Sequence, residues 1–447
     1  MFAGLSRVEN WLGHTKQLAN ARSIYDSYQR HMNSIKKVDK DSSELSIDPL
    51  AAYIKILGSA GRHQEVFDVY YAMDSEGPLA PSQFIYTAMF QALASCSTQE
   101  SVKNAADARL LWTQMQKASQ KPARFLVDAF IVTSAVTALC RGRPADQTFA
   151  FQIVRDYFGL TAPDNPSSTG IIPLTPQSFA AVLLLCNSSG KHHLCDHFLQ
   201  QVKKRPEALG GISILDRAHM DEVLKAHLAM PDSGSGSARY CREILEWMLR
   251  EEITGHNNGP KIRPALSTFN LVLKACWRDG DWRSATRTFD LMTGYHSHNF
   301  MDGAVSHTPR LDKRASGRNL VPTAETLSYL MRTAIASHSH ANVRQCLRIV
   351  DHLGIDQILS SQEMGKTESN QAIKNRAFHA SKLALGTREA VADVANHAGK
   401  TSQGELRRWK DLANQAKEWL RVVPTTEFIP AKELHAKTRL TQYEKTL

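Results

Sequence analysis

The sequence predicts an all-α protein, an α-solenoid whose helix-turn-helix repeats stack into a right-handed superhelix, followed by a helical C-terminal tail. Three observations predict this fold class. Apolar residues recur three and four positions apart, as in 269–276 and 285–292, which is the spacing of one helix face. Clear alternation of apolar and polar residues, the pattern of strands, is absent. A set of landmark residues also returns at constant offsets, and such internal repetition is typical of a solenoid.

The recurring landmark is a glycine followed by one small residue and then by two larger apolar residues. Gly280 is followed at offsets five, nine and twelve by Ala285, Phe289 and Met292, and Gly61, Gly190 and Gly236 begin similar series. We expect the glycine in the turn between two helices, because a positive φ is cheap only for glycine. The later residues share one face of the second helix. One hairpin cannot bury this face alone, so neighbouring hairpins must stack.

These landmarks divide the chain into three parts. Residues 1–48 are predicted to hold a partial repeat, residues 49–353 the α-solenoid, and residues 354–447 a basic helical extension. Prolines ahead of several first helices are consistent with helix starts. Within the solenoid the expected helix pairs are 49–77, 83–118, 126–158, 175–205, 216–252, 265–296 and 323–353, with inserted loops at 161–174, 254–264 and 294–321.

The composition narrows the classes of protein to which the chain can belong. Hydrophobic residues make up 42% and charged residues 22%, which excludes a collagen-like or wholly disordered chain. The longest apolar run, 179–186, is far shorter than the ~20 residues of a membrane helix, so we expect no membrane span. Seven cysteines without a CxxC pair indicate a reducing compartment. The formal net charge of +10 favours acidic partners.

Two segments resemble a known family. Residues 264–292, PALSTFNLVLKACWRDGDWRSATRTFDLM, are similar almost residue for residue to a pentatricopeptide repeat of the organellar P class, and residues 50–73 are similar over their length. The resemblance extends over roughly 16–353. It implies an α-solenoid with units of about 35 residues, close to the 34-residue tetratricopeptide repeat.

What the resemblance implies is binding of single-stranded RNA, with each repeat reading one base through two or three side chains. The reading residues are the one after the aromatic residue of the first helix and the last one before the next repeat. Only Thr87 with Asp128 resembles a standard pair, one that favours guanine, whereas Ala51 and Ala180 have no side-chain donor or acceptor. The RNA-binding residues implied are Thr87, Asp128, Thr133, Thr175, Asn270, Thr323 and Ser328.

The resemblance also implies a mitochondrial matrix protein that acts in RNA stability, processing, translation or ribosome function, with organellar RNA as partner. The acid-poor first residues, which include Arg7, Lys16 and Arg22, have features of a presequence. The alternative is a protein-binding scaffold or assembly factor of a mitochondrial ribosome or respiratory complex, favoured by the two alanines and the long insertions. Phosphate contacts are candidates at Arg310, Lys313, Arg314, Arg318 and the basic residues of 407–421.

No motif of an enzyme is present, since HExxH and GxSxG are both absent, and we expect neither catalysis nor a cofactor. Cys186, His192, His193, Cys195 and His197 have the side chains of zinc ligands. Cys195 and His197, however, are two residues apart and point to different sides of a helix. The sequence therefore predicts no metal site among these five residues.

Overall fold

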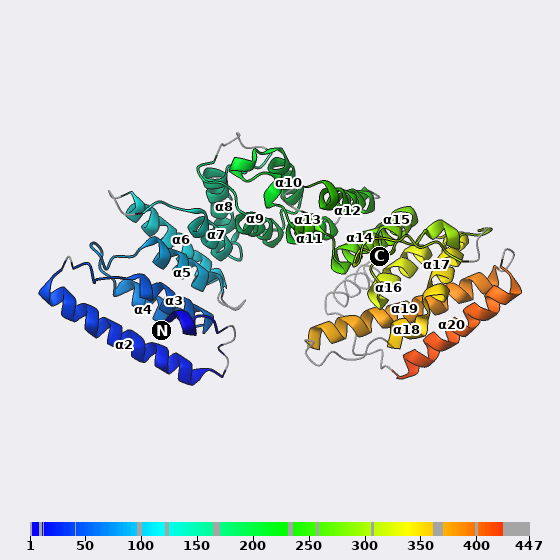
Figure 1. The fold of residues 1–447 in the computed structure, drawn as a ribbon, viewed down its shortest axis with the longest axis horizontal. Helices are drawn as coiled ribbons and strands as arrows, with labels where there is room; N and C mark the ends of the chain where they lie inside the picture. Colours follow the sequence, from blue (N-terminus) through cyan, green and yellow to red (C-terminus); the bar gives the residue numbers. More distant parts are fainter. Residues whose placement is uncertain are drawn as a thin grey trace, which may run out of the picture. The chain divides into compact units, whose positions relative to one another are not determined.

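The computed structural model describes residues 2–8, 11, 13–40, 42–95, 101–120, 125–163, 170–230, 236–255, 259–304, 308–360, 370–397 and 401–422. Regular structure in these residues is helical, with one isolated bridge between Tyr295 and Leu311, which confirms the all-α prediction. The chain divides into two compact units, Met1–Ala226 and His227–Leu447 (Figure 1). Among the described helices, none has the length and hydropathy needed to cross a membrane.

Unit 1 is a succession of helical hairpins. The first helices α3, α5, α7 and α9 pack against one another in chain order, and α4, α6, α8 and α10 each pack against the first helix of their own hairpin (Figure 1). A π-helical turn, Val154–Phe158, extends α8. The helices are α1 (Phe2–Leu5), α2 (Thr15–Val38), α3 (Asp48–Ser59), α4 (His63–Tyr71), α5 (Gln83–Ala94), α6 (Ser101–Ser119), α7 (Ala129–Leu139), α8 (Pro144–Ile153), α9 (Pro176–Ser188), α10 (His193–Lys204) and α11 (Arg217–Ala229).

Unit 2 repeats the arrangement, and it includes part of the predicted C-terminal extension. Helices α14, α16 and α19 pack in succession, and α19 pairs with α20, so the described part of 354–447 continues the stack (Figure 1). The helices are α12 (Ser237–Thr254), α13 (Gly259–Ile262), α14 (Leu266–Asp279), α15 (Trp282–Thr293), α16 (Ala324–Ala336), α17 (His340–Leu353), α18 (Ile355–Ser360), α19 (Asn370–Asn396) and α20 (Gln403–Val422).

The hairpin turns follow the glycine landmark in three of four cases. Gly61, Gly190 and Gly280 have φ of 71°, 70° and 65°, in the left-handed region that favours glycine. The prediction for Gly236 is wrong, because this residue is the N-cap of α12 with φ −110°, which any residue adopts. His338 has φ 50° at the same offset before a buried second-helix residue, Val343.

The landmark residues of the second helices form the core. Ala285, Phe289 and Met292 of α15 are fully buried. The corresponding residues of α10 and α17, the triplets 195, 199, 202 and 343, 347, 350, are buried as well. Burial of apolar surface contributes about 25 cal/mol per Å², so these buried residues help to stabilise the stacked hairpins.

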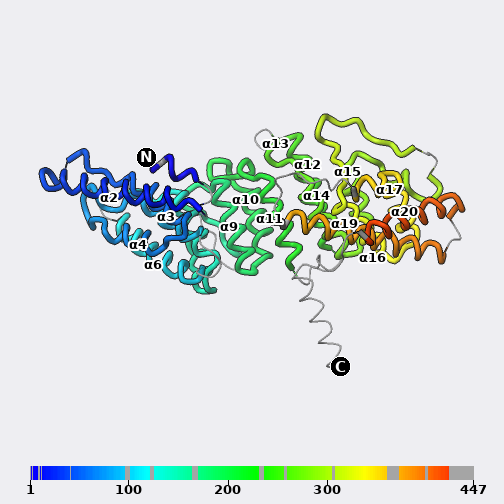
Figure 2. Tube along the Cα trace, turned by 90° about the horizontal axis from the view of Figure 1, so that it is seen from below, coloured from blue at the N-terminus to red at the C-terminus, as the bar shows by residue number. Residues whose placement is uncertain are grey.

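The insertion 294–321 packs closely on unit 2 over its described residues, 294–304 and 308–321. Figure 2 shows it beside α15 and α17. Arg314 donates hydrogen bonds to the carbonyl oxygens of Leu291 at 2.6 Å and Asp290 at 3.1 Å, which lie near the end of α15. Gln345 of α17 donates to the Ser297 carbonyl at 2.8 Å. The insertion therefore satisfies backbone groups at a helix end and holds two second helices together.

Candidate nucleic-acid interface

The predicted reading pair of unit 1, Thr87 and Asp128, lies at the first helices of two adjacent hairpins. Thr87 is half-buried on α5, and its hydroxyl donates to the Gln83 carbonyl at 2.9 Å. Asp128 is the N-cap of α7, and its Oδ1 accepts a 2.9 Å hydrogen bond from the Ile131 amide. Both of these bonds stay within the residue's own helix. The two side chains are therefore positioned by local bonds alone.

Thr133 and Thr175 are brought together by a third hydroxyl. Thr133 Oγ1 on α7 lies 2.7 Å from Ser178 Oγ on α9, and Ser178 Oγ lies 2.8 Å from Oγ1 of Thr175, the N-cap of α9. The Ser178 amide also donates to Thr175 Oγ1 at 3.1 Å. We call this chain of three polar side chains a relay. It connects one hairpin of unit 1 to the next.

Unit 2 contains the same relay with an amide in the first position. Asn270 on α14 is only 4% exposed, and its Oδ1 accepts a 2.8 Å hydrogen bond from Thr326 Oγ1 on α16. Thr326 Oγ1 lies 3.2 Å from Oγ1 of Thr323, the N-cap of α16. Two of the predicted reading residues, Asn270 and Thr323, are therefore engaged in contacts between hairpins.

Ser328 is also engaged by the next first helix. It is fully buried on α16, and its Oγ lies 3.2 Å from His379 Nδ1 on α19. Burial lowers the pKa of His379 to about 4, with contributions from nearby Arg332 and Lys274. The imidazole is therefore neutral at pH 7, and a neutral ring can be buried beside Ser328 without the cost of an isolated charge.

Two exposed aromatic residues were not predicted as site residues. Phe84 on α5 and Phe130 on α7 are 57% and 68% exposed. Each is the second residue of its helix and precedes a hydroxyl residue, Thr87 or Thr133, by three positions, so ring and hydroxyl share one helix face. This common spacing is a signal in the sequence, but apolar residues at helical spacing are also typical of a core. Exposed rings of this kind are platforms on which nucleic-acid bases stack.

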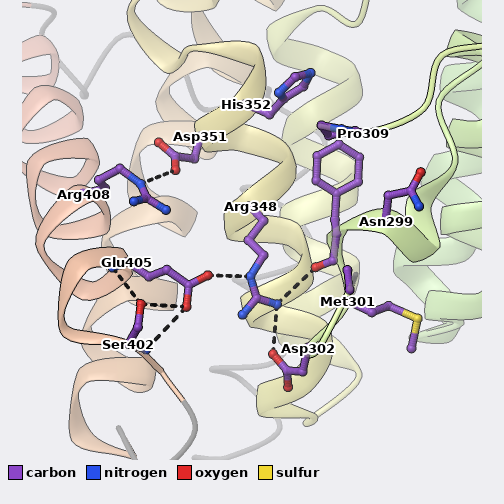
Figure 3. A pocket seen from close by; sticks show the side chains of 13 residues that line it. Asn299, Met301, Asp302, Pro309, Arg348, Asp351, His352, Ser402, Glu405 and Arg408 are labelled. Atoms are coloured by element: carbon purple, nitrogen blue, oxygen red, sulfur yellow. Dashed lines mark hydrogen bonds and ion pairs between the residues drawn. The ribbon is translucent and has the colours of Figure 1, made fainter. Parts of the chain in front are cut away.

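A polar cavity of 500 Å³ in unit 2 is the other candidate, and Figure 3 shows its lining. Arg348 of α17 donates to Glu405 of α20 at 2.8 Å, to Asp302 at 2.9 Å and to the Phe300 carbonyl at 3.1 Å. A hydrogen bond from Arg344, with a second from Arg348, lowers the pKa of Asp302. Because these charges compensate one another, we interpret the cavity as a structural junction between the insertion and α20.

Several cations predicted to contact phosphates are likewise paired within unit 2. Arg408 lies 3.1 Å from Asp351, Arg318 lies 3.3 Å from Glu252, and Arg421 lies 2.7 Å from Glu418. Ion pairs at the surface are weak, so these arginines remain able to exchange partners. In unit 1, Lys55 is exposed on α3 one turn after Ala51 and adds positive charge to the first helices.

Stacked two-helix hairpins, three of them with a glycine turn, define the protein as an α-helical repeat protein. The model of the PPR repeat family matches residues 267–304, which include most of α14 and all of α15. Residues 267–304, in unit 2, therefore match a pentatricopeptide repeat.

Two further comparisons complete this result. A search of curated proteins finds no match. Among solved structures, the chain is similar to the crystal structure of the pentatricopeptide repeat protein PPR10 from maize, with 13% sequence identity and a TM-score of 0.28. That match covers 88% of this chain, and the chain spans 61% of the maize structure's length.

Proposed function

We propose that the protein binds single-stranded RNA and holds it without catalysing a reaction. The observation that supports this proposal is the repeated pairing of an exposed ring with a hydroxyl on adjacent helices, Phe84 with Thr87 on α5 and Phe130 with Thr133 on α7. Stacking of a base on an aromatic ring contributes about 1–3 kcal/mol and tolerates any base. The net charge of +10 adds a salt-dependent contribution from the phosphates.

Base discrimination is proposed to be concentrated at Thr87 and Asp128. Their hydrogen bonds are within their own helices, whereas Thr133, Asn270 and Ser328 contact the following first helix. A side chain already bonded to a neighbouring hairpin must break that bond to read a base edge. The proposed recognition therefore combines general stacking with discrimination at one base.

The binding experiment is a fluorescence-anisotropy titration of labelled single-stranded RNA at several salt concentrations. The double variant F84A/F130A should bind about tenfold or more weakly, because two stacking platforms are removed. Tyr71→Ala is the matched control, since Tyr71 is an aromatic residue that is 69% exposed on a second helix, α4. Equal affinity of the double variant and the control, or binding that does not depend on salt, contradicts the proposal.

A mitochondrial matrix location and a role in RNA stability, processing, translation or ribosome function are the finer part of the proposal. They are supported by the resemblance to organellar members of the family and by the basic, acid-poor first residues. A fusion of a fluorescent protein to the C-terminus tests the location in cells. Fluorescence outside mitochondria contradicts it.

A protein-binding scaffold is the second candidate, and unit 2 supports it. There the predicted reading residues Asn270 and Ser328 are buried, which leaves fewer groups for reading RNA bases. Affinity purification after ribonuclease treatment separates the candidates. A stoichiometric partner that is retained without RNA favours the scaffold.

A further inference from the structure

Two histidines and one aspartate gather where the start of α17 meets the C-terminal part of α19. His340 Nδ1 lies 2.8 Å from Asp393 Oδ2, and His397 Nδ1 lies 3.7 Å from Asp393 Oδ1. The two imidazole rings are stacked with centroids 4.3 Å apart. One ligand atom from each residue lies within 4.8 Å of the others, and in the described residues no other trio of His, Cys, Asp or Glu does so.

A cavity of 400 Å³ lies beside this trio, and two further residues with metal-ligating side chains, His338 and Glu389, line it. Its lining includes His338, His340, Glu389 and Asp393. Glu389 and Asp393 are four residues apart on one face of α19, and His397 follows directly after the last residue of that helix. The cavity therefore offers two imidazoles and two carboxylates from segments that are distant in the sequence, and His397 adds a third imidazole beside it.

The backbone at His338 is an independent indication of a function. His338 is a non-glycine residue with positive φ, 50°, in the turn that enters α17. The corresponding turns of three other hairpins have Gly61, Gly190 and Gly280. A left-handed conformation costs a residue with a side chain about 1 kcal/mol, and such strain is concentrated at functional sites. His338 therefore stands, with a left-handed backbone, at the position where three other turns have glycine.

We propose that His340, Asp393 and His397 bind a zinc ion, with His338 as the fourth donor. Imidazole nitrogen and carboxylate oxygen are the ligands that zinc prefers, in a tetrahedral arrangement with bonds of about 2.0–2.2 Å. For zinc to bind, rotation of these side chains must shorten the present distances between their ligand atoms. The proton of the hydrogen bond between His340 and Asp393 leaves the site or moves to the outer imidazole nitrogen when the ion binds.

This site differs from the cluster of cysteine and histidine residues at 186–197 discussed in the sequence analysis. His192 Nδ1 lies 3.2 Å from Asn187 Oδ1, and His197 Nε2 lies 3.0 Å from the Thr161 carbonyl oxygen. Cys186 and Cys195 are buried in the core of the hairpin. The zinc site proposed here instead joins residues 53 positions apart in the chain, and there His397 Nδ1 also lies 3.0 Å from the Asp393 carbonyl oxygen.

Zinc at this position links α17 directly to α19. The ion compensates the charges of Asp393 and Glu389, which lie at one edge of the cavity. Since only the folded chain brings His340, Asp393 and His397 together, binding should stabilise unit 2 increasingly as the zinc concentration rises. The inferred role is structural and is independent of RNA binding.

The test is a zinc titration of the full chain, purified without a polyhistidine tag and treated with a chelator. Calorimetry should give one zinc per chain with micromolar or tighter affinity, and the melting temperature should rise with zinc. His340→Asn, Asp393→Asn and His397→Asn should each weaken binding about tenfold or more. His296→Asn is the matched control, because His296 pairs with Asp312 at 3.0 Å elsewhere in unit 2.

Cobalt replaces zinc in a second measurement that reports the ligand type. The proposed site predicts visible bands of tetrahedral cobalt without the near-ultraviolet band of a thiolate ligand. Circular dichroism confirms that each variant is folded. Absence of stoichiometric zinc binding, a thiolate band, or an equal loss of affinity in the His296 control overturns the proposal.

Discussion

Asn270 Oδ1 accepts a 2.8 Å hydrogen bond from Thr326 Oγ1, and this bond joins α14 to α16. Thr133 and Ser178 make the equivalent contact between α7 and α9 at 2.7 Å. In both pairs, the residue after the core residue of one first helix meets the residue before the core residue of the next. Positions expected to read bases therefore also set how adjacent hairpins pack.

The first prediction concerns the stability of the Asn270 relay. Asn270→Ala should lower the free energy of unfolding by about 1–3 kcal/mol, because the Thr326 hydroxyl loses the buried acceptor to which it donates. Adding Thr326→Val to this variant should cost less than Thr326→Val costs in the parent, since the bond between the two side chains is already lost. Urea denaturation of the single and double variants measures both changes. Additive losses in the double variant show that the two side chains are not coupled.

The second prediction concerns base discrimination. Thr87→Ala and Asp128→Ala should each weaken discrimination at one base by about 1–3 kcal/mol, a range borrowed from bidentate contacts to DNA. Overall affinity should change less, because stacking and phosphate contacts remain. Competition binding with RNAs that differ at single positions measures the preference. Ala180→Ser, a change on a first helix that adds a hydroxyl at an exposed position, serves as the control for nonspecific effects.

An unaltered base preference in both variants assigns discrimination to other residues. If base preference is unaltered but F84A/F130A binds RNA weakly, the proposal that bases stack on Phe84 and Phe130 still stands. These two outcomes separate general RNA binding from base reading.

The third prediction concerns the backbone of two hairpin turns. The free energy of unfolding is measured with a chelator present. His338→Gly should raise the free energy of unfolding by about 0.5–1 kcal/mol, because glycine adopts the observed φ of 50° without strain. Gly280→Ala should lower it by about 1–2 kcal/mol. A Cβ at Gly280, where φ is 65°, also lies 3.2 Å from the Ala336 carbonyl oxygen. Thermal melts at equal protein concentration compare both variants with the parent. Changes of the same sign in both contradict the assignment of these turns.

The fourth prediction is that the stability of unit 2 depends on pH through the titration of His379. Its folded pKa of about 4 lies below the ordinary value of 6.5, so the unfolded chain takes up the proton first. The stability of unit 2 should be complete above pH 6.5 and should fall by about 2–3 kcal/mol as the pH approaches 4. Urea midpoints at several pH values measure the slope.

His379→Gln is the variant that isolates this effect, because glutamine keeps a hydrogen-bonding group near Ser328 and does not titrate. Glu325 Oε1 lies 3.6 Å from His379 Nε2, whereas carboxylates away from His379 affect the parent and the variant alike as they lose their charge. The stability curves of the two chains should therefore differ in slope mainly between pH 4 and 6.5. Parallel stability curves show that His379 is not the group responsible.

The helices and most turns were predictable because they depend on local features of the sequence. Apolar spacing located both helices of the hairpin around Gly280, and a positive φ at Gly61, Gly190 and Gly280 follows from residue type. Gly236 shows the limit of this argument, since a glycine ahead of a helix needs no special conformation.

The environment of the site residues was much less predictable. Ser328 is buried by His379, which is 51 residues away, and nothing near Ser328 in the sequence indicates this contact. The insertion 294–321 was expected to be a surface loop, yet Arg314 of this segment completes the end of α15. The exposed rings of Phe84 and Phe130 follow the same helical spacing as core residues, so periodicity alone did not distinguish them.

The relays limit how the specificity of this chain can be altered. Exchanging Thr133 or Asn270 for another reader changes the spacing of the next hairpin along with the chemistry presented to the ligand. The hydrogen bonds described above for Thr87 and Asp128 stay within their own helices and do not join neighbouring hairpins. Redesign toward a new target, or natural divergence among descendants of this protein, is therefore easiest at that single pair, where chemistry can vary while the architecture is kept.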